Sequence, residues 1–145
     1  RSIDTDHDVY TTDSGELSLW LRTTSLPIDG LGISLYRVVY DTKYRYWPVN
    51  PYFYRLRMRA LKPFVGTFLI SELQMEPWGP RPVQELSTSE AYRSFSPIDV
   101  ASRIDFARRT GADTILAWGV EWWYYMHKQN LDQQYWQEAI RVFNP

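Results

Sequence analysis

Short apolar runs alternate along this chain with longer segments whose apolar residues recur every three or four positions. The runs are Val9–Thr12, Leu31–Tyr36, Thr67–Glu72 and Thr114–Trp118. Continuous runs of this length, separated by helices, are typical of parallel strands that are buried on both faces. The pattern therefore predicts four parallel strands, each followed by a helix.

The segments between the runs carry the residues that begin and end helices. Pro51 suits the first turn of a helix, Ser96 and Pro97 suit the start of another, and Gly111 suits its end. The helices expected from these signals and from the spacing of apolar residues are Gly15–Leu21, Tyr52–Phe64, Ile98–Thr110 and Asp132–Phe143.

Four strand–helix units fit either an open doubly wound sheet or part of a (β/α)8 barrel. The 145 residues give about 36 residues per unit, and eight such units would span roughly 290 residues, within the range of these barrels. A nucleotide-binding open sheet would show a glycine-rich turn after a strand, and neither Gly-x-Gly-x-x-Gly nor a phosphate loop occurs. We therefore expect an α/β fold forming half of a TIM barrel, a single partial domain over residues 1–145, with residues 1–8 as a linker or the remnant of a preceding loop.

Composition and charge narrow the classes of function. The net charge of −1 argues against nucleic acid as a partner, because phosphate binding needs a basic surface. The absence of cysteine excludes disulfides and thiolate chemistry, and two histidines leave little for a zinc site, so no metal and no cofactor are expected. No apolar run is long enough for a membrane-spanning helix. This composition suits a protein on either side of a bacterial membrane, so it does not decide between a cytoplasmic and an exported location.

Acidic and aromatic residues cluster just after the predicted strands. In a parallel barrel the active face lies at the carboxyl ends of the strands. Indole and phenol rings can cover the apolar faces of sugar rings, while carboxylates bind hydroxyl groups or perform chemistry. Candidates for binding a carbohydrate are Asp13, Glu16, Tyr36, Glu76, Trp78, Trp118, Glu121 and Trp123.

Glu72 is the leading candidate for catalysis because Thr67–Ser71 lead into it with the character of a buried strand. A carboxylate at the rim of such a strand is partly desolvated, which makes its reactivity adjustable. The competing interpretation is a salt bridge to Arg57 or Arg37.

These strand ends resemble those of the retaining (β/α)8 glycoside hydrolases, the superfamily that includes cellulases and β-galactosidases. Ile70-Ser71-Glu72 is similar to the end of the seventh strand, which carries the nucleophile. The segment from Asp29 to Tyr36 resembles the sixth strand, and Ile115 to Gly119 resembles the eighth, whose Trp lies beneath the sugar being cleaved. The segment from Thr11 to Glu16 would then end the fifth strand, so that the chain spans strands five to eight.

The resemblance implies a mechanism that uses two carboxyl groups. Glu72 would attack the anomeric carbon, Tyr36 would hydrogen-bond Glu72 and hold it in the charged form, and Trp118 would stack on the sugar. The superfamily's acid/base is a Glu that follows an Asn on the fourth strand, and no Asn-Glu pair occurs here. We therefore expect the chain to be the catalytic fragment of a longer enzyme, inactive alone, that associates with the N-terminal half of the same barrel.

Three alternatives stay open at this point. Glu72 and Glu121 follow neighbouring strands and could form an acid/base pair within this chain. The chain could instead be a carbohydrate-binding or structural remnant of a barrel that has no catalytic activity. It could also be an unrelated open-sheet domain, and the curvature and order of the strands would distinguish that case.

Overall fold

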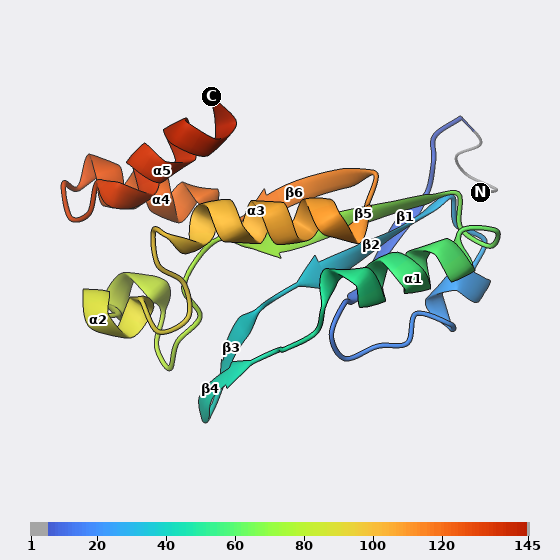
Figure 1. Cartoon of the computed structure of the whole chain (residues 1–145), viewed down its shortest axis with the longest axis horizontal. Coiled ribbons are helices and arrows are strands. Elements are labelled where there is room, and N and C mark those ends of the chain that lie inside the picture. The colour runs from blue at the N-terminus through green and yellow to red at the C-terminus, as the bar shows by residue number, and fades with distance from the viewer. Residues whose placement is uncertain (1–5, 145) are drawn as a thin grey trace.

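A computed structural model describes residues 6–144 and is a mixed α/β structure built around a four-stranded parallel sheet (Figure 1). The strands are β1 (Tyr10–Ser14), β2 (Gly30–Leu35), β3 (Val38–Asp41), β4 (Lys43–Tyr46), β5 (Thr67–Gln74) and β6 (Thr114–Trp118). The α-helices are α1 (Pro51–Leu61), α2 (Thr88–Ala91), α3 (Asp99–Thr110), α4 (Val120–Lys128) and α5 (Gln134–Phe143), and the 3-10 helices are η1 (Thr23–Ser25) and η2 (Val83–Glu85).

The four predicted strands form one sheet in the order β1-β2-β5-β6, and every neighbouring pair is parallel. Spatial order therefore follows chain order, without the reversal that defines a doubly wound sheet. Of the segment 1–8 expected to be a linker, residues 1–5 lie outside the described residues, and residues 6–8 precede β1 without joining a helix or strand.

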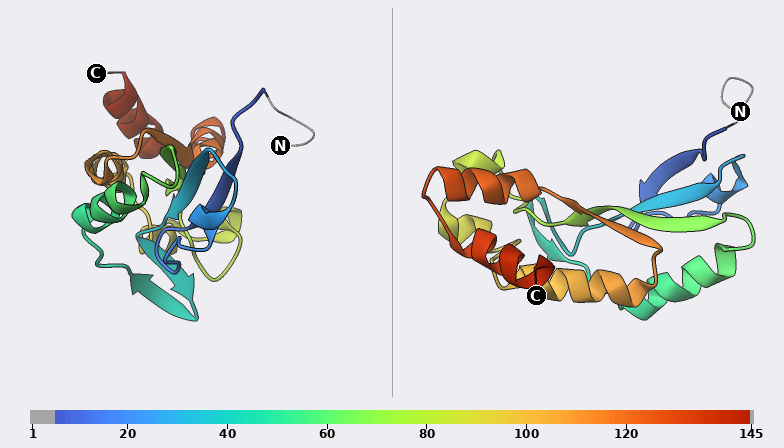
Figure 2. Two further views of the ribbon diagram at one scale, coloured as in Figure 1. Left: turned by 90° about the vertical axis from the view of Figure 1, so that its right-hand side faces the viewer. Right: turned by 90° about the horizontal axis from the view of Figure 1, so that it is seen from above.

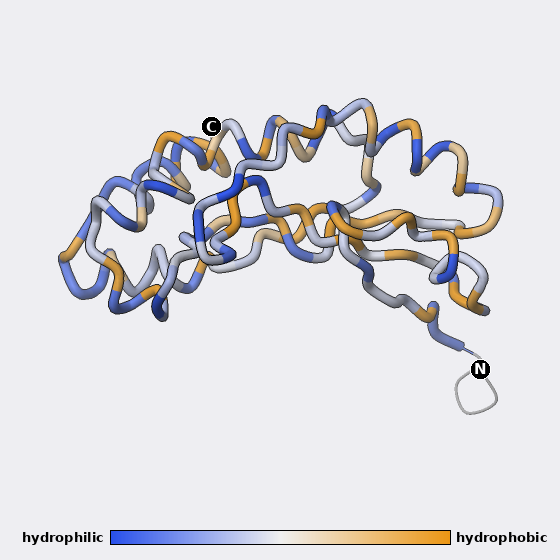
Figure 3. The backbone as a smooth tube through the Cα atoms, turned by 90° about the horizontal axis from the view of Figure 1, so that it is seen from below, coloured by the Kyte–Doolittle hydropathy of each residue, from blue (hydrophilic) through white to orange (hydrophobic). Residues whose placement is uncertain are grey.

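Helices α1 and α3 lie against one face of the sheet and contact each other (Figure 2). Leu31, Ile33, Phe68 and Ile70 point to this side and are fully or almost fully buried. In Figure 3 the strands carry long apolar stretches, whereas the helices alternate between apolar and polar positions, as expected for helices that cover one face of a core. Within residues 6–144 the structure contains no helix with the length and apolar character needed to cross a bilayer.

The signals that begin and end the helices act largely as expected. Pro51 opens α1, and the Asn50 side chain accepts the backbone N–H of Tyr52 at 2.9 Å. The start of α3 is held by Asp99, whose carboxylate accepts both the backbone N–H and the hydroxyl of Ser96. Gly111 ends α3 in the left-handed conformation, at φ 78°.

The helix predicted over Gly15–Leu21 is wrong, because the segment forms a loop. Trp20 has a positive φ of 64°, which interrupts a helix, and its indole donates to the Ser14 carbonyl at 2.8 Å. The ring is 1% exposed and packs on Tyr54 of α1 and Phe68 of β5. A single buried indole therefore covers the part of the sheet where a helix was expected.

The antiparallel hairpin β3–β4, which follows β2, was not predicted. The start of this hairpin is fixed by Gln74, a buried residue at the end of β5. The Gln74 amide oxygen accepts the backbone N–H groups of Arg37 and Val38, and its amide nitrogen donates to the Val38 carbonyl. The hairpin is closed by the backbone N–H of Trp47, which donates to the Arg37 carbonyl at 2.8 Å. One side chain thus holds the hairpin beside the carboxyl end of the sheet.

The opposite face of the sheet carries no helix in the described part of the chain (Figure 2). Tyr10, Leu116 and Trp118 are 45%, 50% and 47% exposed on the two outer strands. Gly32 lies at the centre of this face, where an added Cβ would come within 2.9 Å of the Ser71 Cβ. The sheet thus has one packed face and one open face, and the candidate site lies on the open side.

Candidate functional site

An open cleft of about 490 Å³ lies at the carboxyl ends of the parallel strands. Five of the nine residues singled out in the sequence line it, namely Glu16, Tyr36, Glu72, Trp78 and Trp118. They come from the segments that end or follow β1, β2, β5 and β6, and the parallel sheet brings those ends to one edge. The other lining residues are Ser14, Leu17, Ser34, Val39 and Trp47.

The direction of the Glu72 side chain depends on a bulge in β5. Between Ile70 and Leu73 this strand has one residue more than the strands on either side, β2 and β6. Ile70 pairs with Ile33 of β2 and Ile115 of β6. Leu73 pairs with Leu35 and Ala117, which are only two residues further along those strands. Ile70 and Leu73 are both fully buried beneath the helices. Ser71 and Glu72 between them both line a hollow on the open face. Bulges of this kind redirect a side chain beside a functional site.

Tyr36 contacts Glu72 directly. Its hydroxyl donates a hydrogen bond of 3.0 Å to Glu72 Oε2, as the sequence led us to expect. Burial raises the pKa of the Tyr36 phenol, and the bond to Glu72 and the nearby carboxylates raise it further. The phenol therefore keeps its proton near neutral pH and remains a donor. Tyr36 is itself held by the Trp78 ring, which meets it edge to face at 5.2 Å between centroids.

The salt bridge considered for Glu72 does not form, because Arg37 and Arg57 are engaged elsewhere. Arg57 donates to the Ser18 carbonyl at 2.5 Å and stacks over the Trp20 ring. Arg37 donates to the Val49 carbonyl and to the Tyr46 hydroxyl. The polar contact of Glu72 within the cleft is thus a neutral phenol.

Glu16 contributes a second carboxyl group to the cleft. Its Oε1 accepts the backbone N–H of Tyr36 at 2.7 Å, which ties the loop after β1 to the end of β2. Burial raises the pKa of Glu16 to about 7, although hydrogen bonds from backbone N–H groups and the charge of Arg37 oppose this change. Near neutral pH this carboxyl group can therefore either donate or accept a proton.

Glu76 and Glu121 lie close enough to influence each other but are not among the residues that line the cleft. Burial raises the pKa of Glu76, the charge of Glu121 raises it further, and a hydrogen bond with Trp118 opposes both effects. The electrostatic partner of Glu121 is therefore Glu76. This arrangement does not favour the alternative in which Glu121 pairs with Glu72, and the hydrogen bond links Glu76 to Trp118.

Trp123 requires a correction, because it cannot line a groove for substrate. It is 3% exposed, its ring stacks on Phe95, and its indole donates to the Met75 carbonyl at 2.6 Å. As the fourth residue of α4 it lies on the side of the helix that faces the core. Trp123 therefore belongs to the core that supports the site.

Asp13 also has a mainly structural position, although it borders the hollow beside Glu72. Burial acts to raise its pKa, but hydrogen bonds from Thr23, Ser18 and the Ser14 backbone, with the charge of Arg57, outweigh burial and lower it. Both carboxylate oxygens are occupied in holding the loop after β1.

Trp47 and Val39 were not among the predicted site residues. Both belong to the hairpin segment, whose packing beside the cleft depends on Gln74. The aromatic richness of residues 44–54 was the available signal, since such a loop could extend a sugar-binding groove, but it did not distinguish Trp47 from its neighbours. No pattern in the sequence indicated that Gln74 would be the residue that fixes the hairpin.

Among residues 6–144, no three carboxylate or imidazole side chains gather in a way that could hold a metal ion. Comparison of the chain with known proteins identified no relative: no family model, no curated protein and no solved structure matches it. Chemical interpretation of the cleft therefore rests on its own geometry.

Proposed function

We propose that this chain is part of the catalytic barrel of a retaining glycoside hydrolase, with Glu72 as the nucleophile. The observation that carries the proposal is the Tyr36–Glu72 hydrogen bond at the carboxyl ends of sequentially ordered parallel strands. Trp78 and Trp118, each nearly half exposed, supply aromatic surface to the same cleft, and Trp47 adds a third ring. Carboxylates beside exposed indoles are the groups that a sugar site requires.

In this proposal Tyr36 orients the nucleophile. Its hydroxyl engages Glu72 Oε2, so that the other carboxylate oxygen is free to attack the anomeric carbon. Attack forms the glycosyl–enzyme ester and breaks the bond to the leaving oxygen. That oxygen takes a proton from the acid/base, a carboxyl group other than Glu72 and Glu16. Water then cleaves the ester as that group accepts a proton, with the two carboxyl groups about 5–5.5 Å apart. The second group comes from the other half of the barrel.

Two features support half of a barrel over an open-sheet domain. The four parallel strands follow one another in chain order, without the reversal of a doubly wound sheet. The face without helices exposes Leu116 and Tyr10, and the interior of a closed barrel is filled by side chains from such a face. We propose that strands one to four complete the sheet at both edges, which would also remove two exposed edges prone to aggregation.

The test is covalent labelling of the chain by 2,4-dinitrophenyl 2-deoxy-2-fluoroglycosides of gluco and galacto configuration. Dinitrophenolate leaves without help from an acid, so the first step needs only the nucleophile. We expect one fluoroglycosyl group per chain, mapped by peptide mass spectrometry to Glu72 and absent from Glu72→Gln. Glu85→Gln, which changes an exposed glutamate that does not line the cleft, is the matched control and should label like the wild type. A label that persists in Glu72→Gln would contradict the assignment.

The alternative is a domain that binds carbohydrate without cleaving it, and the same cleft favours it through its exposed indoles. In that case Glu72→Gln would leave oligosaccharide binding intact, Trp118→Ala would weaken it, and no label would form on the wild type. Binding measured by tryptophan fluorescence, alongside labelling, distinguishes the two functions.

A further inference from the structure

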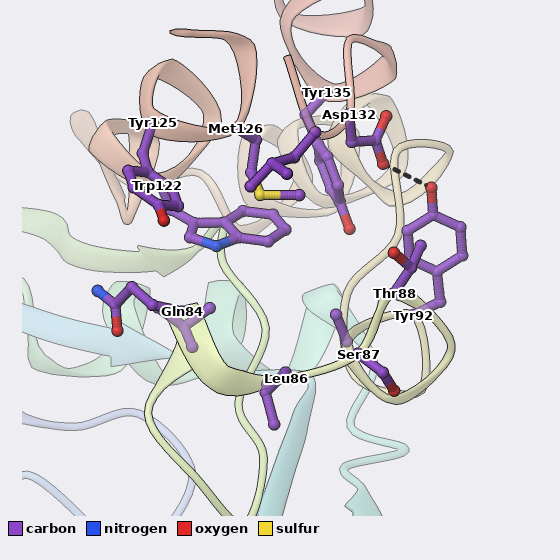
Figure 4. Close-up of a pocket in the computed structure, with 13 residues that line it drawn as sticks. Gln84, Leu86, Ser87, Thr88, Tyr92, Trp122, Tyr125, Met126, Asp132 and Tyr135 are labelled. Atoms are coloured by element: carbon purple, nitrogen blue, oxygen red, sulfur yellow. Dashed lines mark hydrogen bonds between the residues drawn. The ribbon is translucent and has the colours of Figure 1, made fainter. Parts of the chain in front are cut away.

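A second pocket, of about 220 Å³, lies between α4 and the segment that includes η2 and α2 (Figure 4). Trp122, Tyr125 and Met126 of α4 form one wall, and Leu86 and the segment leading into α2 form the other. None of its lining residues belongs to the cleft that holds Glu72. What binds here is therefore independent of the proposed glycosidase function.

The indole of Trp122 has an unused hydrogen-bond donor. The side chain is 4% exposed, yet among the described residues its Nε1 has no acceptor. In Figure 4 this nitrogen faces the gap toward Gln84 and Leu86. Two other buried indoles are satisfied: Trp20 donates to the Ser14 carbonyl and Trp123 to the Met75 carbonyl. Because a buried donor without a partner costs about 1–3 kcal/mol, an acceptor that reached this nitrogen from the pocket would be favoured.

The rest of the lining indicates what kind of acceptor is suitable. The Trp122 ring meets the Tyr135 ring edge to face at 4.6 Å between centroids, and the Met126 thioether lies beside them, so this part of the lining is aromatic and apolar. At the other end the Asp132 carboxylate accepts the Tyr92 hydroxyl at 2.7 Å and the Gln134 backbone N–H at 2.9 Å. No lysine or arginine lines the pocket, so the local charge disfavours an anion.

We propose that this pocket binds a small neutral ring compound whose carbonyl oxygen accepts a hydrogen bond from Trp122 Nε1. The ring of the compound lies against the apolar side chains of the pocket, Met126 among them, and its polar substituent carries the acceptor. The volume is below the 300–1,000 Å³ typical of sites for drug-sized ligands, so the compound is a single ring with one polar substituent.

Benzamide is the probe, since it has one ring, a carbonyl acceptor and an amide donor, and toluene is the matched compound without the acceptor. The chain contains three methionines, and a sample labelled with ¹³C at the methionine methyl groups reports on all of them. Met126 lines the pocket, whereas Met58 and Met75 are buried elsewhere and serve as internal controls. We expect benzamide to shift the Met126 methyl and the Trp122 indole N–H signals saturably and to leave Met58 and Met75 unchanged.

The variant Trp122→Phe keeps an aromatic side chain and removes the donor, and we expect it to weaken benzamide binding at least about fivefold, as for the loss of one neutral hydrogen bond. Trp118→Phe, in the other cleft, should bind benzamide like the wild type. The comparison of benzamide with toluene uses the wild-type chain, so it stands even where Trp122→Phe fails to fold. The proposal is overturned by equal binding of the two compounds, by shifts of all three methionines together, or by no saturable shift up to the solubility limit of benzamide.

Discussion

Replacement of Glu16 by Gln tests how the cleft is built, because this partly buried carboxyl group lines the same cleft as the nucleophile candidate. The Gln side chain retains a carbonyl oxygen that can accept the Tyr36 backbone N–H, now 2.7 Å from Glu16 Oε1. The substitution therefore keeps the shape and the hydrogen bond and removes only the ionisation. Any dependence of the difference in stability on pH then reports the charge of Glu16.

The magnitude follows from the pKa, which burial raises from 4.5 in the unfolded chain to about 7 in the folded protein. Since each pH unit corresponds to about 1.4 kcal/mol, this change amounts to at most about 3 kcal/mol. A raised carboxyl pKa means that the folded state holds the proton more tightly. The stabilising contribution is therefore complete below pH 4.5 and is lost as pH rises to about 7, where the folded protein must bury the charge.

We expect Glu16→Gln to match the wild type near pH 4.5 and to be more stable by about 2–3 kcal/mol above pH 7. Urea unfolding followed by tryptophan fluorescence across this range gives the free energies of unfolding for both proteins. All other titrating groups cancel in the difference between them. Glu85→Gln, at an exposed glutamate, should show no such trend. A difference that is constant with pH, or that favours the wild type at high pH, would refute the account of Glu16 as a partly buried carboxyl group whose pKa is raised by desolvation.

Three further substitutions test other parts of the structure. Tyr36→Phe removes the donor to Glu72 and should slow labelling of Glu72 by fluoroglycosides about tenfold or more, because a hydrogen bond to a charged group contributes about 1.5–3 kcal/mol. An unchanged rate would mean that the phenol does not orient the nucleophile. Trp20→Ala should lower the free energy of unfolding by about 3–5 kcal/mol in urea titrations, since the ring is 1% exposed. A loss below about 1 kcal/mol would show that the loop after β1 collapses to fill the space. Gly111→Ala should lower the melting temperature, because φ is 78° there and a Cβ costs about 1–2 kcal/mol; no change would mean that the end of α3 rearranges freely.

The sequence by itself determined the elements whose signals are local. Four apolar runs became the four parallel strands, and Pro51 and Gly111 mark helix ends as expected, because these effects act within a few residues of the chain. The gathering of Tyr36, Glu72, Trp78 and Trp118 at one edge also followed from the sequence, since parallel strands place their carboxyl ends together.

Only the tertiary structure decided which way the critical side chains point. Strict alternation from Ile70 would have put Glu72 under the helices, and the extra residue in β5 appears only when the strand pairs with β2 and β6 at once. Trp122 and Trp123 are adjacent in α4, yet among the described residues the Trp123 indole donates to the Met75 carbonyl and the Trp122 indole has no acceptor. Gln74 fixes a hairpin 36 residues away in sequence. Registers, bulges and long-range hydrogen bonds depend on partners that are distant along the chain, so a local pattern of residues does not predict them.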